Sequence, residues 1–192
     1  MRAVLASANA NKLDELRAAL PGWELELLRA PSLPEETGKT YEENARAKAE
    51  FGRGLAPDAW VLGEDSGIEV EALGGGPGVT SARWAEDGVA EILRRLDGVE
   101  DRRARYVCEL VAAGPGGEER RGSGTLEGTI ATGRRGNEGF GYDPIFVPVG
   151  ETRTVAELGN AWKRTNSHRA RAARALTSGA DTPAKPADRA NP

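Results

Sequence analysis

Two acidic residues and a serine follow a short apolar run near the middle of the chain. Glu64, Asp65 and Ser66 follow Trp60-Val61-Leu62 after one glycine, and Gly67 comes next. A strand that ends at such residues delivers two carboxylates and a hydroxyl to the rigid edge of a sheet, where they can bind a divalent metal or deprotonate a water molecule. The same residues also fit a turn with solvated acids, so this segment alone leaves both interpretations open.

A loop of small and polar residues joins the first predicted strand to the first predicted helix. Small residues let backbone N–H groups approach an anion, and the N-terminus of the following helix adds a favourable dipole. The loop lacks the Gly-x-x-x-x-Gly-Lys-Ser/Thr pattern of a Walker loop, and an ordinary strand-to-helix turn is the alternative. Lys12 can add a point charge for a phosphate. The candidate anion-binding residues are Ser7, Ala8, Asn9, Ala10, Asn11 and Lys12.

Glu36 and Phe140 depend on the fold for any functional role. Glu36 belongs to an acidic loop pair that is solvated unless the fold brings it beside Asp65, since Mg²⁺ takes a few carboxylates together with phosphate oxygens and water. Phe140 lies between Gly139 and Gly141, and these glycines leave room for a flat ligand to stack on the ring. A structural turn with Phe140 in the core is the alternative.

A basic segment that holds the sole histidine precedes the last predicted helix. Ser167 can cap this helix, which places His168 and Arg169 in its first turn. Because a helix N-terminus is already positive, cations placed there indicate an anionic or carbonyl-rich ligand nearby. A surface histidine on a solvated basic face is the alternative. A zinc site is disfavoured because the chain has no second histidine.

The composition predicts one acidic domain without general affinity for nucleic acid. The chain has 192 residues, of which 39% are hydrophobic and 25 are glycine, and its net charge is -4. Cys108 is the single cysteine, which excludes an internal disulfide, and its apolar surroundings indicate a buried, inert thiol. No apolar run approaches the length of a membrane span or a signal-peptide core. We therefore expect a cytoplasmic protein that binds neither nucleic acid nor a membrane.

Strands and helices alternate without a regular βαβ rhythm, which predicts an α/β fold with a mixed sheet. Gly122 and Gly124 indicate a bulge or bend in their strand, and Thr40 with Glu43 predicts a capping box. We expect the folded domain to span residues 1–176, followed by a disordered tail, 177–192, that is rich in Ala, Pro and Asp. The predicted strands are 4–6, 23–28, 60–62, 68–73, 105–113, 120–130 and 145–148, and the predicted helices are 11–20, 41–52, 88–96 and 167–176.

In their order and spacing, these segments resemble the inosine/xanthosine triphosphate pyrophosphatase family. The resemblance covers positions 7 to 169. Glu64 departs from the Asp that the family commonly has there, so a metal role for this residue is not carried over. The matching stretches are Ser7-x-Asn9-x-x-Lys12, Glu36 with Tyr41-x-x-Asn44-Ala45, Asp65-Ser66-Gly67 with Gly78-x-x-Ser81-Ala82-Arg83, Phe140-Gly141-Tyr142-Asp143-Pro144, and Lys163 with Ser167-His168-Arg169.

The resemblance implies an elongated mixed sheet with flanking helices that form two lobes around a central cleft, in a homodimer. It also implies Mg²⁺-dependent hydrolysis of ITP, dITP and XTP to a nucleoside monophosphate and pyrophosphate. Glu36 and Asp65 would hold the Mg²⁺, and Asp65 would accept a proton from the attacking water. The residues that would bind the substrate are the 7–11 loop, Lys12 and Ser66 at the triphosphate, Phe140 with Gly141 and Tyr142 at the face of the base, and Asp143, Lys163, His168 and Arg169 at its edge.

Two alternatives stay open at this point. One is a related pyrophosphatase that acts on pyrimidine or modified nucleotides, although the Ser167-His168-Arg169 segment favours purines. The other is a non-enzymatic nucleotide sensor. Glu36 and Asp65 argue against a sensor, because carboxylates repel phosphates unless a metal lies between them.

Overall fold

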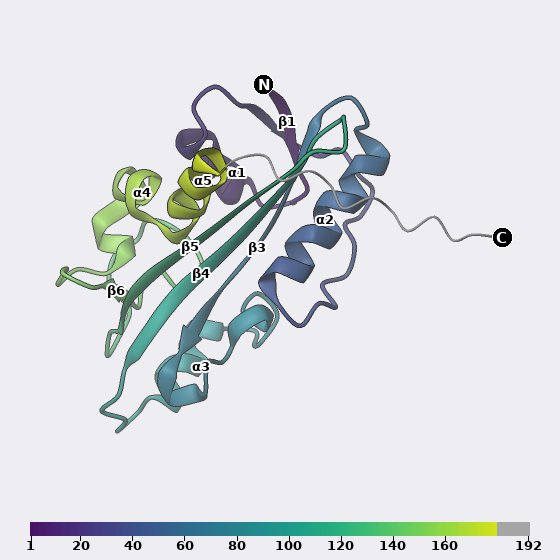
Figure 1. The fold of residues 1–192 in the computed structure, drawn as a ribbon. Coiled ribbons are helices and arrows are strands. Elements are labelled where there is room, and N and C mark those ends of the chain that lie inside the picture. The colour runs from purple at the N-terminus through teal and green to yellow at the C-terminus, as the bar shows by residue number, and fades with distance from the viewer. Residues whose placement is uncertain (180–192) are drawn as a thin grey trace.

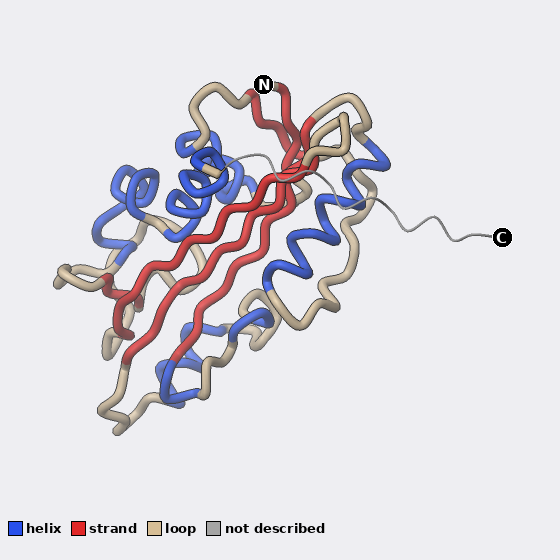
Figure 2. The backbone as a smooth tube through the Cα atoms, viewed as in Figure 1, coloured by secondary structure: helices blue, strands red, loops and turns tan. Residues whose placement is uncertain are grey.

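A mixed sheet of six strands runs through the molecule and confirms the expected α/β class (Figures 1 and 2). The computed structural model describes residues 1–179. The strand order is β2-β1-β3-β4-β5-β6, in which β1 pairs in parallel with β2 and β3, and the other neighbours are antiparallel. The strands are β1 (Arg2–Leu5), β2 (Glu24–Leu27), β3 (Trp60–Val70), β4 (Arg103–Ala113), β5 (Glu119–Ile130) and β6 (Phe146–Pro148).

Helices cover both faces of the sheet. Helix α2 packs against β3 and β4 on one face, whereas α5 packs against β4 and β5 on the other and also contacts α1 and α4 (Figure 1). No helix in the described part of the chain is long and apolar enough to cross a membrane. The helices are α1 (Ala10–Ala19), α2 (Tyr41–Leu55), α3 (Gly88–Arg95), α4 (Val155–Asn166) and α5 (His168–Ser178), and short 3-10 turns lie at Glu71–Leu73 and Gly78–Thr80.

Side-chain caps fix where the functional helices begin. The capping box of Thr40 and Glu43 starts α2, and the Ser167 side chain accepts a hydrogen bond from the backbone of Ala170 at the start of α5. Both caps were expected from the sequence and are confirmed. Helix α4 was not expected, although Thr154 begins it with a capping box of the same kind. Its pattern is broken at Gly159, where φ is 84°.

The Glu-Asp-Ser-Gly stretch is not a turn, and that prediction was wrong. Strand β3 is continuous through it and pairs with β4 from Val61 to Val70. It also lies inside the sheet, between β1 and β4, and not at an edge. Gly67 meets a packing requirement here, because a Cβ at this position would lie 2.3 Å from the carbonyl oxygen of Gly78. The expected alternation stops at Val70 because the chain then enters the 3-10 turn.

The expected bulge in β5 is also absent. The strand pairs with β4 in unbroken register, from Arg103 opposite Thr129 to Ala113 opposite Glu119. Gly122 and Gly124 instead make room for α5. A Cβ added to Gly122 would lie 2.1 Å from the Ala172 carbonyl oxygen, and one at Gly124 would lie 2.2 Å from that of His168. The two glycines therefore let the backbone of α5 rest directly on the sheet.

The C-terminal boundary differs from the expected one. Helix α5 continues through Thr177 and Ser178, so these residues are helical and do not begin a disordered tail. The rest of the expected tail, from residue 180 to 192, lies outside the described residues.

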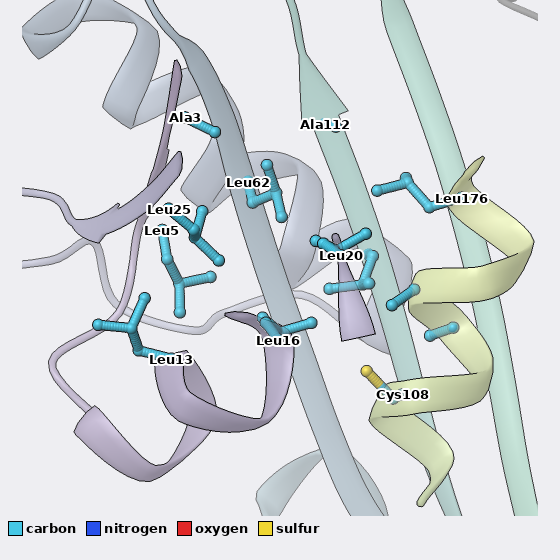
Figure 3. Packing of buried hydrophobic residues seen from close by; sticks show 13 residues of the cluster. Ala3, Leu5, Leu13, Leu16, Leu20, Leu25, Leu62, Cys108, Ala112 and Leu176 are labelled. Carbon is cyan, nitrogen blue, oxygen red and sulfur yellow. The ribbon is translucent and has the colours of Figure 1, made fainter. Parts of the chain in front are cut away.

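Two apolar clusters lie at either end of the long strands. The first contains Leu62 and Cys108 and gathers under α1 and α5 (Figure 3), whereas the second contains Ile68 and Tyr106. Cys108 is fully buried, as expected, and burial raises the pKa of its thiol well above the ordinary value, so the group stays protonated and inert. Glu64 and Ser66 of β3 therefore interrupt the core between the two clusters.

The close contact between α5 and the sheet predicts the effect of one added methyl group. Gly124→Ala should destabilise the protein by about 1–3 kcal/mol, because the new Cβ meets backbone that cannot move aside. Gly54→Ala is the control, since nothing lies within 4 Å of a Cβ there, and it should be neutral or stabilising by up to about 1 kcal/mol. Urea unfolding measures both, and equal stability of the two variants would contradict the packing argument.

Candidate active site

The two adjacent acids of β3 point to opposite faces of the sheet. Neighbouring side chains alternate along a strand, so Glu64 and Asp65 cannot share one site. The contacts agree with this alternation. Asp65 meets residues of α2, whereas Glu64 meets Lys12 of α1 and Arg169 of α5.

On the α2 face, Asp65 belongs to a compact group of acids and cations. The side-chain amide of Asn44 donates to Asp65 over 2.9 Å, and the Lys48 ammonium lies 3.6 Å from the other carboxylate oxygen. Lys48 also donates to Glu36 and, over 3.0 Å, to the Glu64 carbonyl oxygen. Glu36 is held from its other side by Arg83, at 2.6 Å. The fold thus brings Glu36 and Asp65 to the same lysine, although they lie in different segments.

Burial and charge act in opposite directions on these groups. Burial raises the pKa of Asp65 above its ordinary value, although Lys48 and Asn44 oppose the rise. Burial alone would lower the pKa of Lys48, but Asp65 and Glu36 outweigh it, so the pKa of Lys48 is raised and the ammonium stays charged. Burial would likewise raise the pKa of Glu36, but Lys48 lowers it on balance. Asp65 is therefore the better proton acceptor of the two acids.

The donor set on this face suits a divalent metal that arrives with a phosphate. Among residues 1–179, no group of three or more His, Cys, Asp or Glu side chains could hold a metal unaided. Mg²⁺ is usually bound by one or two carboxylates together with water and substrate phosphates, and Glu36 with Asp65 can provide that pair. Lys48 contacts both carboxylates and already shows that a cation is accommodated there.

On the opposite face, Arg169 is fixed by three protein groups. Its Nε donates to Glu64 over 3.0 Å, Nη1 lies 3.2 Å from Glu15, and Nη2 donates to the Ser66 hydroxyl over 2.8 Å. Glu64 also binds Lys12, whose ammonium lies 2.6 Å away. Ser66 shares this face with Glu64, as the strand alternation requires.

The Lys163 ammonium connects Arg169, through Glu15, to the aromatic loop, residues 139–144, which holds Phe140. It lies 2.8 Å from Glu15 and 2.7 Å from Asp143, and Asp143 also accepts hydrogen bonds from the Phe140 amide and the Tyr106 hydroxyl. The Phe140 ring lies over the Lys163 ammonium at 4.1 Å. Phe140 is half-buried and lies beside charged groups, so it is not part of the apolar core.

His168 is a neutral, buried ring. It stacks on Tyr106, with 4.6 Å between the ring centroids and 11° between the planes. Burial lowers the pKa of His168 well below its ordinary value, and the neighbouring Arg169 lowers it further. Its Nδ1 has no hydrogen-bond partner within the described residues.

Two cavities share Lys12 in their linings. The larger cavity, of about 700 Å³, is lined by residues of the aromatic loop and of the basic segment. The smaller cavity, of about 500 Å³, is lined by Lys48 and Arg83 among others. The expected site residues that line the larger cavity are Asn9, Lys12, Ser66, Phe140, Gly141, Tyr142, Asp143, Lys163, His168 and Arg169, and those that line the smaller one are Ser7, Lys12 and Glu36.

Four expected residues line neither cavity. Ala8, Ala10 and Asn11 are exposed, and Asp65 lies behind Lys48. The loop before α1 also uses part of its own donor set. The Asn9 side chain accepts hydrogen bonds from the backbone amides of Asn11 and Lys12, so Asn9 caps the helix and both N–H groups already have a partner.

A model of the Ham1 family matches residues 3–178. The chain belongs to the Ham1 family. The dITP/XTP pyrophosphatase of Deinococcus deserti is 46% identical over 180 residues, which cover 90% of this chain and 86% of that protein. The dITP/XTP pyrophosphatase of Symbiobacterium thermophilum is 48% identical, with coverage of 89% and 90%. The Staphylococcus aureus Ham1 protein superposes with a TM-score of 0.80 at 37% identity, covering 93% of this chain and 97% of its own.

The candidate site also includes residues to which the sequence alone gave no role. Asn44 and Lys48 lie one helical turn apart on α2, so an i, i+4 polar pair on a buried helix face was the available signal. Glu15 is an acid beside the apolar positions of α1, and its partners lie about 150 residues away. Tyr106 has no local signal, because its role comes only from Asp143 and His168.

The neutral state of His168 predicts a specific loss of stability in acid. The unfolded chain takes up a proton on this residue as the pH falls through the ordinary value of 6.5, whereas the folded chain does not. The free energy of unfolding should therefore fall below this pH, by up to about 1.4 kcal/mol per pH unit. His168→Phe keeps a ring against Tyr106 but cannot titrate, so its stability should fall less. Urea unfolding between about pH 7.5 and pH 5.5 measures both slopes, and equal slopes would contradict a neutral His168.

Proposed function

We propose that this chain hydrolyses the non-standard purine nucleoside triphosphates ITP, dITP and XTP, using Mg²⁺ and releasing a nucleoside monophosphate and pyrophosphate. The observation that carries the proposal is that two different groups of side chains lie on opposite faces of the sheet at β3. Asp65 lies with Glu36 and Lys48 on one face, and an aromatic cleft lined with donors lies on the other. The names of the relatives support the same substrate class.

The arrangement of the two cavities supports cleavage between the α- and β-phosphates. The base and sugar fit the larger cavity, which holds Phe140. The smaller cavity is lined by Lys12, Lys48 and Arg83, whose positive charges suit the two phosphates that leave as pyrophosphate. Because Lys12 lines both cavities, the bond that joins the two products lies beside it.

Asp65 is the proposed proton acceptor for the attacking water. Asn44 and Lys48 fix its carboxylate, and its raised pKa strengthens it as a base. When Mg²⁺ is bound, it neutralises phosphate charge and acidifies a water molecule, and Glu36 and Asp65 are the carboxylates that would hold it. Catalysis then depends mainly on positioning and on the charge of Lys12 and Lys48, since phosphoryl-type transfer asks little covalent chemistry of the protein.

The hydrogen-bond inventory of the larger cavity favours a 6-oxo purine. Lys163 and Arg169 are donors only, and they can pair with the oxo group of hypoxanthine or xanthine. Asp143 is the acceptor nearest to Lys163, but its oxygens already accept from Lys163, Phe140 and Tyr106. The 6-amino donor of adenine would face cations and a largely saturated carboxylate, which costs about 1–3 kcal/mol per unpaired group.

The proposal includes a single domain with two lobes that acts as a cytoplasmic homodimer and binds neither nucleic acid nor a membrane. The resemblance in the sequence supports this assembly. Size-exclusion chromatography with light scattering tests it, and a monomeric mass for the active enzyme would contradict it.

The purified protein should release pyrophosphate from ITP, dITP and XTP in the presence of Mg²⁺. ATP should be hydrolysed at least about tenfold more slowly, because its base leaves a donor unpaired. A pyrophosphate-release assay with ITP, XTP, dITP, ATP, GTP and TTP provides the measurement. Orthophosphate as the first product, full activity in EDTA, or a preference for TTP would each contradict the proposal.

Asp65→Asn should fold normally and lose at least about 100-fold in kcat, because the amide keeps the shape but cannot accept a proton. Glu69→Gln is the matched control, since Glu69 lies on the same strand and face but pairs with the exposed Arg105. Its activity should equal that of the wild type. Turnover of Asp65→Asn within a few-fold of the control would assign the proton acceptor elsewhere.

A further inference from the structure

Glu64 is a buried carboxylate that the proposed chemistry does not use. Its side chain is 1% exposed and lies in the middle of β3, between the two apolar clusters. A charge in such a place costs free energy unless it is paired, so the residue needs a compensating function. It faces away from Asp65 and Glu36, which removes it from the group that suits a metal.

The two oxygens of Glu64 hold cations from two helices that are far apart in the sequence. Oε2 lies 2.6 Å from the Lys12 ammonium of α1, and Oε1 accepts from Nε of Arg169 in α5 over 3.0 Å. The Cys108 thiol lies 3.7 Å from Oε1 on the core side. One carboxylate of β3 therefore links the two helices on the face of the sheet opposite Asp65.

These two cations serve different parts of the proposed substrate. Lys12 lines both cavities, and Arg169 lines the larger one. Arg169 also donates to Ser66, two residues along the strand from Glu64. Glu64 is thus the side chain that contacts both Lys12 and Arg169.

We propose that Glu64 is a positioning residue that sets the spacing between the phosphate-binding Lys12 and the base-end Arg169, and that it does not bind the metal. The inference rests on the proposed function. Without the carboxylate, two cations that now share one counter-charge would repel each other, and the flexible stem of Lys12 would let its ammonium move. Nucleotide affinity and base selection would then change together.

Glu64→Gln tests this role, because the amide keeps the shape but removes the charge and turns a donor toward one of the two cations. The KM for ITP should rise about 10- to 100-fold, the range for losing hydrogen bonds to charged groups, with a smaller change in kcat. The ratio of kcat/KM for ITP to that for ATP should narrow, because Arg169 loses one of the three groups that fix its direction. Glu64→Asp restores the charge with a shorter reach and should give a KM between the two. Glu69→Gln should match the wild type.

Three readouts separate this role from its competitors. The Mg²⁺ concentration for half-maximal activity should stay unchanged in Glu64→Gln, and a rise in it with an unaltered KM for ITP would make Glu64 a metal ligand and overturn the proposal. A merely structural role would lower the melting temperature and reduce kcat equally for ITP and ATP. The KM values and the ITP/ATP ratio of kcat/KM would then stay unchanged, and this result would also overturn the proposal.

Binding without turnover provides the third readout. In the Asp65→Asn background, calorimetry should show weaker binding of ITP when Glu64→Gln is added, by the same factor as the rise in KM. Unchanged ITP affinity there would overturn the positioning role. If the wild-type protein binds ITP, and Glu64→Gln weakens that binding, but no pyrophosphate is released, the proposed function would be contradicted. The positioning role of Glu64 would still stand.

Discussion

One strand that stays extended through two adjacent acids determines the rest of this site. Because β3 does not turn at Glu64 and Asp65, its alternation assigns one carboxylate to each face of the sheet. Each acid then requires its own cations, which α2 provides on one face and α1 with α5 on the other. The ammonium of Lys48 contacts Asp65 and also donates a hydrogen bond to the backbone carbonyl of Glu64, so it binds both residues from the α2 face. The sheet therefore separates the residues proposed for proton transfer from those proposed to position the substrate.

The core supports this arrangement by leaving a gap for it. Apolar packing on the strands is concentrated in two clusters, one around Leu62 and one around Ile68, and the polar side chains occupy the interval between them. Helix α5 reaches this interval because the glycines of β5 allow its backbone to touch the sheet. The directions of His168 and Arg169 follow from that contact and from the Ser167 cap. Packing far from the proposed substrate site thus fixes the groups that line it.

Local signals in the sequence predicted the helix starts, but not the partners of buried charges. Thr40 and Ser167 carry their capping information within three residues, so both helices could be placed. Gly67 was misinterpreted because a glycine after a serine resembles a turn, whereas its cause is the carbonyl of Gly78. Glu36 and Asp65 were assigned together by family resemblance, but Glu15 could not be, because the cations that it binds lie some 150 residues later in the chain. Such long-range pairing has no periodicity for a sequence pattern to reveal.

The charges of the base end are balanced before any ligand arrives. Each of its cations is paired with a carboxylate, and the pairs are buried or nearly so, where dissolved salt screens them weakly. The set consists of Lys163 and Arg169 of the base end, together with Lys12 beside the proposed phosphate site, against Glu15, Glu64 and Asp143. A neutral purine would add no charge there, whereas the phosphates would meet the cations of the smaller cavity, of which Arg83 is exposed. Ionic strength should therefore govern how fast a nucleotide is captured, while the choice among bases stays nearly independent of salt.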